Sequence, residues 1–157
     1  MSPLVSRQEL PSLVDELCGW GSGLICLLTD RNNPHQFEQV AHELGLAYVQ
    51  LSLELAKGLL DVPRSERPLQ VLSKLRGISR DLPERVALGR LGILHLPELQ
   101  LNALATLKTI SRDRVVLAEW LGEYRDGRLV YATRDHPEFG QWDAPDIFVV
   151  SAEEEPI

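Results

Sequence analysis

The stretch from residue 24 to residue 45 constrains the fold more than any other part of the chain. Residues 24–28 are all apolar and predict a strand that is buried on both faces. A polar turn follows at residues 29–33, after which Asn33 is suited to cap a helix and Pro34 to be its first residue. Apolar residues then recur at helical spacing until Gly45, which supplies a stop. A strand, a turn and a helix near the start of a chain favour an α/β fold.

The rest of the chain continues this alternation of strands and helices. Further strands are predicted at residues 46–51, in the first part of residues 86–96, and at residues 115–120 and 147–150. Further helices are predicted at residues 6–18, 53–61, 67–76 and 97–110. Asp126-Gly127 between two apolar stretches predicts a β-hairpin. The pattern indicates a mainly parallel sheet covered by helices on both faces. The hairpin and the last strand suggest an antiparallel addition at one edge of this sheet. We expect one domain over residues 1–151 and an acidic tail at residues 152–157.

Composition narrows the classes of function. The net charge of −7 over 157 residues argues against a general nucleic-acid-binding protein. No apolar run approaches the roughly 20 residues that a membrane-spanning helix needs. The first residues do not read as a signal peptide, so the expected location is the cytoplasm, without a membrane partner. Cys18 and Cys26 lie in apolar surroundings and are expected to be buried rather than joined in a disulfide.

The turn at residues 29–33 occupies the place of a phosphate-binding loop but lacks its chemistry. Such a loop needs glycines for close backbone approach, a lysine for the phosphates and a hydroxyl for Mg²⁺. The turn instead offers Asp30, Arg31, Asn32 and Asn33, and the first lysine of the chain is Lys57. The later core strand carries glycines where a catalytic acid would be expected, at Gly89 and Gly92. The sequence therefore argues against an enzyme, and it predicts no cofactor.

Several segments resemble one known family. Residues 51–63, 92–99, 107–122, 126–132 and 136–139 are similar to the small P-loop-containing protein of type-three bacteriophage-exclusion (BREX) systems. The resemblance implies a P-loop NTPase-like three-layer sandwich and a role in bacterial antiviral defence beside larger protein partners. Typical members carry a G-x-x-x-x-G-K-[ST] loop and an acid on the later core strand. This chain departs from the family at both places, which places ATP hydrolysis in doubt and leaves the fold and the partner role intact.

Two groups of candidate site residues follow. The first marks the position of a lost nucleotide site: the turn residues Asp30, Arg31, Asn32 and Asn33, with Arg112 and Arg114, which match the family just before a core strand. The second is a loop whose aromatic and polar side chains suit a protein interface: His136, Phe139 and Trp142. No spacing of histidines and cysteines predicts a metal site.

Three hypotheses of function remain open at this point. The first is a non-hydrolysing structural or regulatory subunit of a phage-defence complex that acts through protein partners, with self-association as a further expectation. The second is a small ATPase that uses Arg31, Arg112 and Glu98 and is completed by a partner subunit. The third is an accessory subunit that contacts DNA, indirectly or weakly, through Arg76, Arg80, Arg85 and Arg90.

Overall fold

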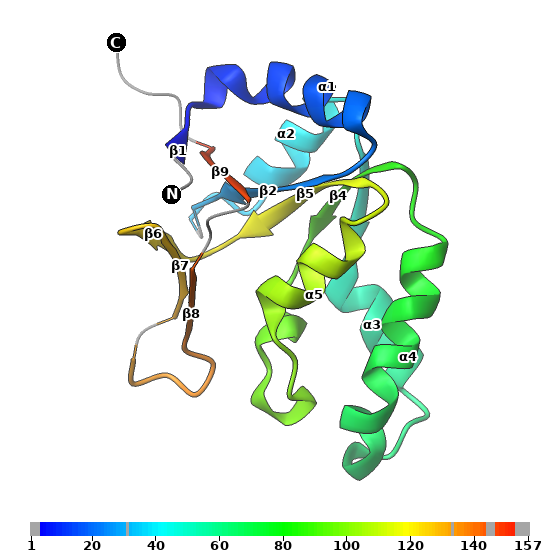
Figure 1. Cartoon of the computed structure of the whole chain (residues 1–157). Helices are drawn as coiled ribbons and strands as arrows, with labels where there is room; N and C mark the ends of the chain where they lie inside the picture. Colours follow the sequence, from blue (N-terminus) through cyan, green and yellow to red (C-terminus); the bar gives the residue numbers. More distant parts are fainter. Residues whose placement is uncertain (1–3, 31, 133, 144–146, 153–157) are drawn as a thin grey trace.

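A six-stranded parallel sheet forms the centre of the molecule (Figure 1). The computed structural model describes residues 4–30, 32–132, 134–143 and 147–152. The strands follow the order β1-β9-β2-β5-β4-β3 across the sheet, and every pair runs parallel. Their bounds are Leu4–Val5 (β1), Gly23–Leu28 (β2), Ala47–Gln50 (β3), Arg85–Gly89 (β4), Val115–Trp120 (β5) and Phe148–Ser151 (β9). The predicted α/β class with a mainly parallel sheet is confirmed.

Helices cover both faces of this sheet and make three layers (Figure 1). One face carries α1 (Leu10–Trp20) and α2 (Gln36–Glu43), and the other carries α3 (Leu51–Leu59), α4 (Arg67–Arg80) and α5 (Ala103–Ile110). Alternate residues of β2 enter the two cores: Ile25 and Leu27 pack toward α1 and α2, whereas Leu24 and Cys26 pack toward α3 to α5. Burial on both faces explains why β2 reads as a continuous apolar run.

Short 3-10 helices join several of these elements. They span Arg7–Glu9 (η1), Arg64–Glu66 (η2), Gly92–His95 (η3) and Pro97–Leu99 (η4). The helix predicted over residues 97–110 is therefore broken: η4 ends at Leu99, the next residue, Gln100, has a φ of 54°, and α5 begins separately at Ala103. Asn102 caps α5, because its side-chain oxygen accepts the Ala105 N–H at 3.0 Å.

A second sheet of three antiparallel strands follows β5. It consists of β6 (Glu123–Arg125), β7 (Arg128–Tyr131) and β8 (Gly140–Asp143). Asp126 and Gly127 form its two-residue turn with φ of 52° and 78°, so the predicted hairpin is confirmed. Its predicted place was wrong, because the hairpin pairs with β8 in a sheet of its own instead of extending the edge of the main sheet.

The last strand also differs from the prediction of an antiparallel edge addition. β9 runs parallel and lies inside the main sheet, between β1 and β2. Val149 and Val150 are both fully buried and face opposite cores, which requires an interior position. Ala152 is buried and donates its N–H to the Leu28 carbonyl at 2.9 Å, so the packed body includes residue 152. The rest of the predicted acidic tail lies outside the described residues.

The two cysteines are free within this fold. Cys26 is buried in β2, and burial raises the pKa of its thiol to about 12. Cys18 in α1 is only half-buried, so the prediction of two buried cysteines is confirmed for Cys26 alone.

Candidate functional site

Ligands of parallel α/β sheets bind outside the carboxyl ends of the strands, where the connections of neighbouring strands diverge. In this chain that point lies at β2, whose neighbours are β5 and β9. The chain leaves β2 through α2 toward β3 at the far edge, whereas β9 lies on the other side. Asp30, Arg90 and Glu119 all lie at this carboxyl edge, after or near the ends of β2, β4 and β5.

The turn after β2 is closed by its own hydrogen bonds. The Asp30 carboxylate accepts the N–H of Asn32 at 2.9 Å, and the Asp30 carbonyl accepts the N–H of Asn33 at 3.0 Å. Gln36 donates its N–H to the Asn33 carbonyl at 3.2 Å and accepts the Asp30 N–H on its side-chain oxygen at 3.3 Å. Arg31 lies outside the described residues. A phosphate loop directs such N–H groups at an anion, but here the Asp30 carboxylate fills that role.

This turn also corrects the predicted start of the helix. Asn33 and Pro34 are not its cap and first residue, because α2 begins at Gln36 and no side chain caps it. Asp30 folds the chain into an Asx turn, which competes with the helix for the same backbone groups. The sequence pattern could not separate these two outcomes, since aspartate and asparagine favour both.

The expected position of a catalytic acid on β4 is closed by an aromatic ring. A Cβ atom added to Gly89 would lie 2.6 Å from Cε1 and 3.0 Å from the hydroxyl oxygen of Tyr48. Tyr48 comes from β3 and also packs against Phe37 of α2, with ring centroids 6.0 Å apart. Burial raises the pKa of Tyr48, and Glu119 raises it further, so the phenol is protonated at neutral pH. Gly89 therefore admits the tyrosine ring and excludes a longer side chain.

Arg90 follows Gly89 in a left-handed conformation, with φ of 54°. Three contacts hold it there: its N–H donates to Glu119 Oε1 at 2.9 Å, and its carbonyl accepts both the N–H of Ser52 at 2.9 Å and the Ser52 hydroxyl. The Glu119 carboxylate is therefore already a hydrogen-bond acceptor for the backbone N–H of Arg90. Neither Tyr48 nor Glu119 was predicted from the sequence, although a single acid near the end of an otherwise apolar strand is a signal that could have identified Glu119.

Arg112 and Arg114 lie at the opposite end of the sheet from Asp30. They precede β5, whose first residue, Val115, pairs with the first residue of β2, Gly23. Arg114 is buried and donates to the Ile110 carbonyl at 3.2 Å and to the Leu82 carbonyl at 2.7 Å, and its guanidinium contacts Asp113 at 3.1 Å. Arg114 thus ties the end of α5 to the loop before β4. The structure does not bring these arginines together with the turn at residues 29–33.

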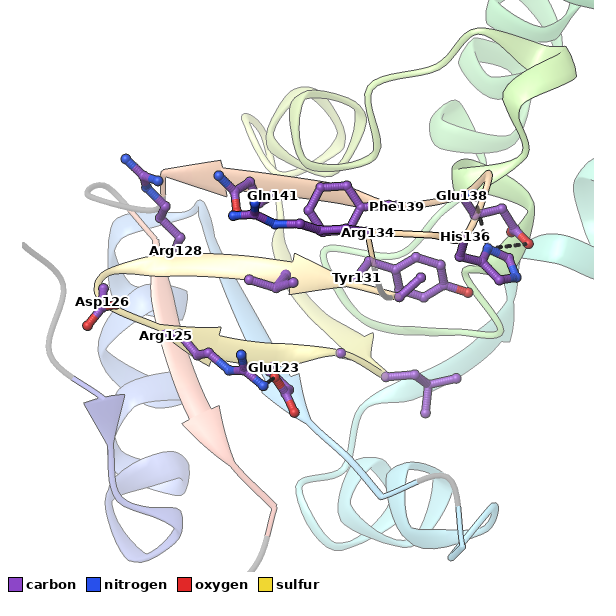
Figure 2. Close-up of a pocket in the computed structure, with 14 residues that line it drawn as sticks. Glu123, Arg125, Asp126, Arg128, Tyr131, Arg134, His136, Glu138, Phe139 and Gln141 are labelled. Carbon is purple, nitrogen blue, oxygen red and sulfur yellow. Dashed lines mark hydrogen bonds and ion pairs between the residues drawn. The ribbon is translucent and has the colours of Figure 1, made fainter.

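A second candidate surface lies on the outer face of the three-stranded sheet (Figure 2). It is an open cavity of about 970 Å³. Its lining residues come from the segment before β6, from β6, β7 and their turn, and from β8 and the loop before it. They are Leu121, Gly122, Glu123, Arg125, Asp126, Arg128, Val130, Tyr131, Ala132, Arg134, His136, Glu138, Phe139 and Gln141. We call this surface the outer-face cavity. It is large enough for several side chains of a bound molecule.

The predicted interface residues divide between the two faces of this sheet. His136 and Phe139 line the outer-face cavity, where the N–H of Glu138 donates to His136 Nδ1 at 3.1 Å. Trp142 does not line the cavity: it packs against Trp120 of the main sheet, with ring centroids 5.5 Å apart and planes at 89°. Trp142 therefore helps to join the two sheets.

Trp142 belongs to a cluster of four rings that includes His95, Trp120 and Tyr131. His95 stacks on Tyr131, with centroids 3.5 Å apart and planes at 6°. Burial lowers the pKa of His95 to about 4, so its ring is neutral at physiological pH. Trp120 donates its Nε1–H to the Val130 carbonyl at 3.1 Å. The cluster fixes the three-stranded sheet to the main domain through both packing and a hydrogen bond.

The described part of the chain holds no group of three His, Cys, Asp or Glu side chains placed to bind a metal ion. Nor does any helix within it have the length and apolar character to cross a bilayer. Comparison with protein-family models, with curated proteins and with solved structures gives no match for this chain. The fold and the two surfaces define an α/β protein with a parallel six-stranded sheet and an inserted antiparallel sheet.

Proposed function

We propose that this chain is a non-hydrolysing subunit with a degenerate P-loop-like domain, which acts through protein partners. The observation that carries the proposal is the closed carboxyl edge. In the turn after β2, the Asp30 carboxylate accepts a hydrogen bond from the backbone N–H of Asn32. Tyr48 fills the space beside Gly89 into which the side chain of an acid would extend. On the strength of the sequence resemblance, we further propose that the partners belong to a bacterial phage-defence (BREX) complex in the cytoplasm.

The hypothesis of an active ATPase has less support. Of its three proposed residues, Arg112 lies at the amino end of β5, away from the carboxyl edge. Glu98 lies in η4 and forms an exposed ion pair with Arg64 at 3.5 Å. An acid that aligns the attacking water must face the phosphates. For Glu98 to do so, a partner subunit would have to place the nucleotide beside η4.

The hypothesis of DNA contact also has less support. Its four arginines come from α4 and from both ends of β4: Arg85 opens the strand, and Arg90 follows its last residue. Arg90 is moreover positioned by Glu119 and Ser52. The set therefore does not make one continuous basic face that could follow a phosphate backbone.

Isothermal titration with ATP and Mg²⁺, together with a phosphate-release assay, tests the proposed function. We expect no saturable binding at micromolar nucleotide and no turnover. Micromolar binding with turnover that is lost on substituting Arg31 would contradict the proposal. Turnover that appears only when partner proteins are added, and disappears with Arg112→Ala, would instead favour the shared-site ATPase.

A further inference from the structure

We propose that the outer-face cavity binds an extended, acidic peptide segment of a partner protein, with Arg134 as the anchor for its carboxylate. This inference rests on the proposed partner role and specifies its surface and the chemistry of the partner. The argument depends on the shape of the cavity, on which of its charges are already paired, and on the exposed edge of the sheet.

The shape of the cavity suits a chain segment rather than a small molecule. It is open and runs over the outer face of the sheet, from the hairpin turn at Asp126 to the loop that carries His136 and Phe139 (Figure 2). Val130 on the central strand and Phe139 in the loop before β8 give the cavity an apolar part of its lining. A peptide in extended conformation presents side chains on alternate sides, so one side can rest on this apolar lining while its backbone stays exposed.

The arginines of the cavity differ in their pairing. Arg125 forms an ion pair with Glu123 on its own strand, and Arg128 contacts Asp143 across the strand pair at 2.9 Å. No ion pair joins Arg134 to any acid in the described part of the chain. Its side chain extends over the sheet beside Phe139 and Gln141 (Figure 2). A guanidinium in this position offers a planar pair of donors to a carboxylate, while Phe139 supplies an apolar neighbour.

The acids of the cavity decide against a nucleic acid as its occupant. Glu123, Asp126 and Glu138 line it together with the three arginines, and the whole chain carries a net charge of −7. A phosphate backbone would meet these carboxylates along its length, whereas a peptide can place one carboxylate at Arg134 and uncharged groups elsewhere.

The sheet itself offers a second means of recognition. β6 is one of the two edge strands of this sheet, and β7 is its pairing partner. Glu123 and Arg125 of β6 line the cavity, and an edge strand in this position is one that an extended peptide can pair with by strand addition. The side-chain anchor at Arg134 and the backbone edge at β6 thus favour the same kind of ligand.

Fluorescence anisotropy with defined probes tests this proposal. The supporting probe is a labelled peptide in which serine alternates with valine and one central serine is replaced by glutamate, and its matched control carries glutamine in place of that glutamate. We expect the glutamate peptide to bind and Arg134→Gln to weaken it by roughly tenfold, the loss typical of a charge-assisted pair. Arg76→Gln, an exposed arginine of α4, is the control variant and should leave the affinity unchanged.

Three results would overturn the proposal: equal binding of the glutamine peptide, an affinity that Arg134→Gln does not alter, or preferential binding of labelled oligothymidine. Circular dichroism of each variant checks that the fold is retained. The outcome is separate from that of the nucleotide titration. Failure of the peptide assay with a silent nucleotide titration removes this site alone, whereas ATP turnover removes the proposed function.

Discussion

At the scale of single residues, two side chains explain why the carboxyl edge is closed. Asp30 turns its carboxylate back onto the Asn32 amide, and Tyr48 lies over Gly89. In the proposed function these two residues act differently: Asp30 adds negative charge where phosphates would bind, and Tyr48 fills the place of a catalytic acid for hydrolysis. The following two predictions address them separately.

Restoring an acid at the β4 position should destabilise the protein rather than create an active site. Gly89→Asp forces its Cβ to within 2.6 Å of the Tyr48 ring, so we expect a loss of about 1–3 kcal/mol in the free energy of unfolding. Urea denaturation measures this. Tyr48→Ala combined with Gly89→Asp should cost less than the sum of the two single changes, because the collision is relieved. Gly92→Ala, where no atom lies within 4 Å of an added Cβ, is the control.

The Asp30 turn should depend on a side-chain acceptor and not on its charge. Asp30→Asn retains an oxygen for the Asn32 N–H, whereas Asp30→Ala loses it, and we expect about 0.5–1.5 kcal/mol of destabilisation for the alanine variant alone. Thermal denaturation of the two variants provides the comparison. Equal losses for asparagine and alanine would show that the carboxylate charge, not the Asx turn, supports this segment.

At the scale of elements, the ring cluster connects η3, β5, β7 and β8. His95 contributes from η3, Trp120 from β5, Tyr131 from β7 and Trp142 from β8. Among the described residues, no strand of the three-stranded sheet pairs with the main sheet, and this cluster and the Trp120–Val130 hydrogen bond join the two sheets. The orientation of the outer-face cavity therefore depends on the cluster.

The cluster should also make the fold sensitive to acid. The pKa of His95 is lowered from 6.5 to about 4 in the folded protein, so the unfolded chain takes up a proton first as pH falls. The contribution of neutral His95 is complete above pH 6.5. It is lost progressively as pH falls toward 4, by about 1–3 kcal/mol after allowance for partial exposure.

His95→Phe provides the matched comparison, because it keeps an aromatic ring and removes the titrating group. We expect the difference in unfolding free energy between wild type and this variant to change with pH across the range from 6.5 to about 4. Parallel curves of unfolding free energy over that range would show that His95 does not titrate as the structure indicates.

At the scale of the whole molecule, local patterns in the sequence predicted the elements better than their arrangement. The apolar runs of β2 and β5 and the Asp126-Gly127 turn are local signals, and the structure confirms all three. The place of β9 between β1 and β2 is set by burial on both faces across distant segments, which no local pattern encodes.

The candidate site was predictable only in part, for the same reason. The sequence placed Asp30, Asn32 and Asn33 in the turn after β2, and the structure confirms this. The sequence could not show that Arg114 donates its hydrogen bonds to the Leu82 and Ile110 carbonyls, or that the Tyr48 ring packs over Gly89. Both contacts join separate elements. Phe139 and Trp142 lie near each other in sequence, but Phe139 lines the cavity and Trp142 joins the ring cluster.

The central claim is that the carboxyl edge of the sheet is closed to nucleotides by its own side chains. Backbone amide chemical shifts, followed by NMR during titration with ATP and Mg²⁺, test it directly. The account predicts that the amides of Asn32, Asn33 and Gln36, already bonded within the turn, keep their shifts throughout. Shifts at these amides that saturate at micromolar nucleotide would contradict it.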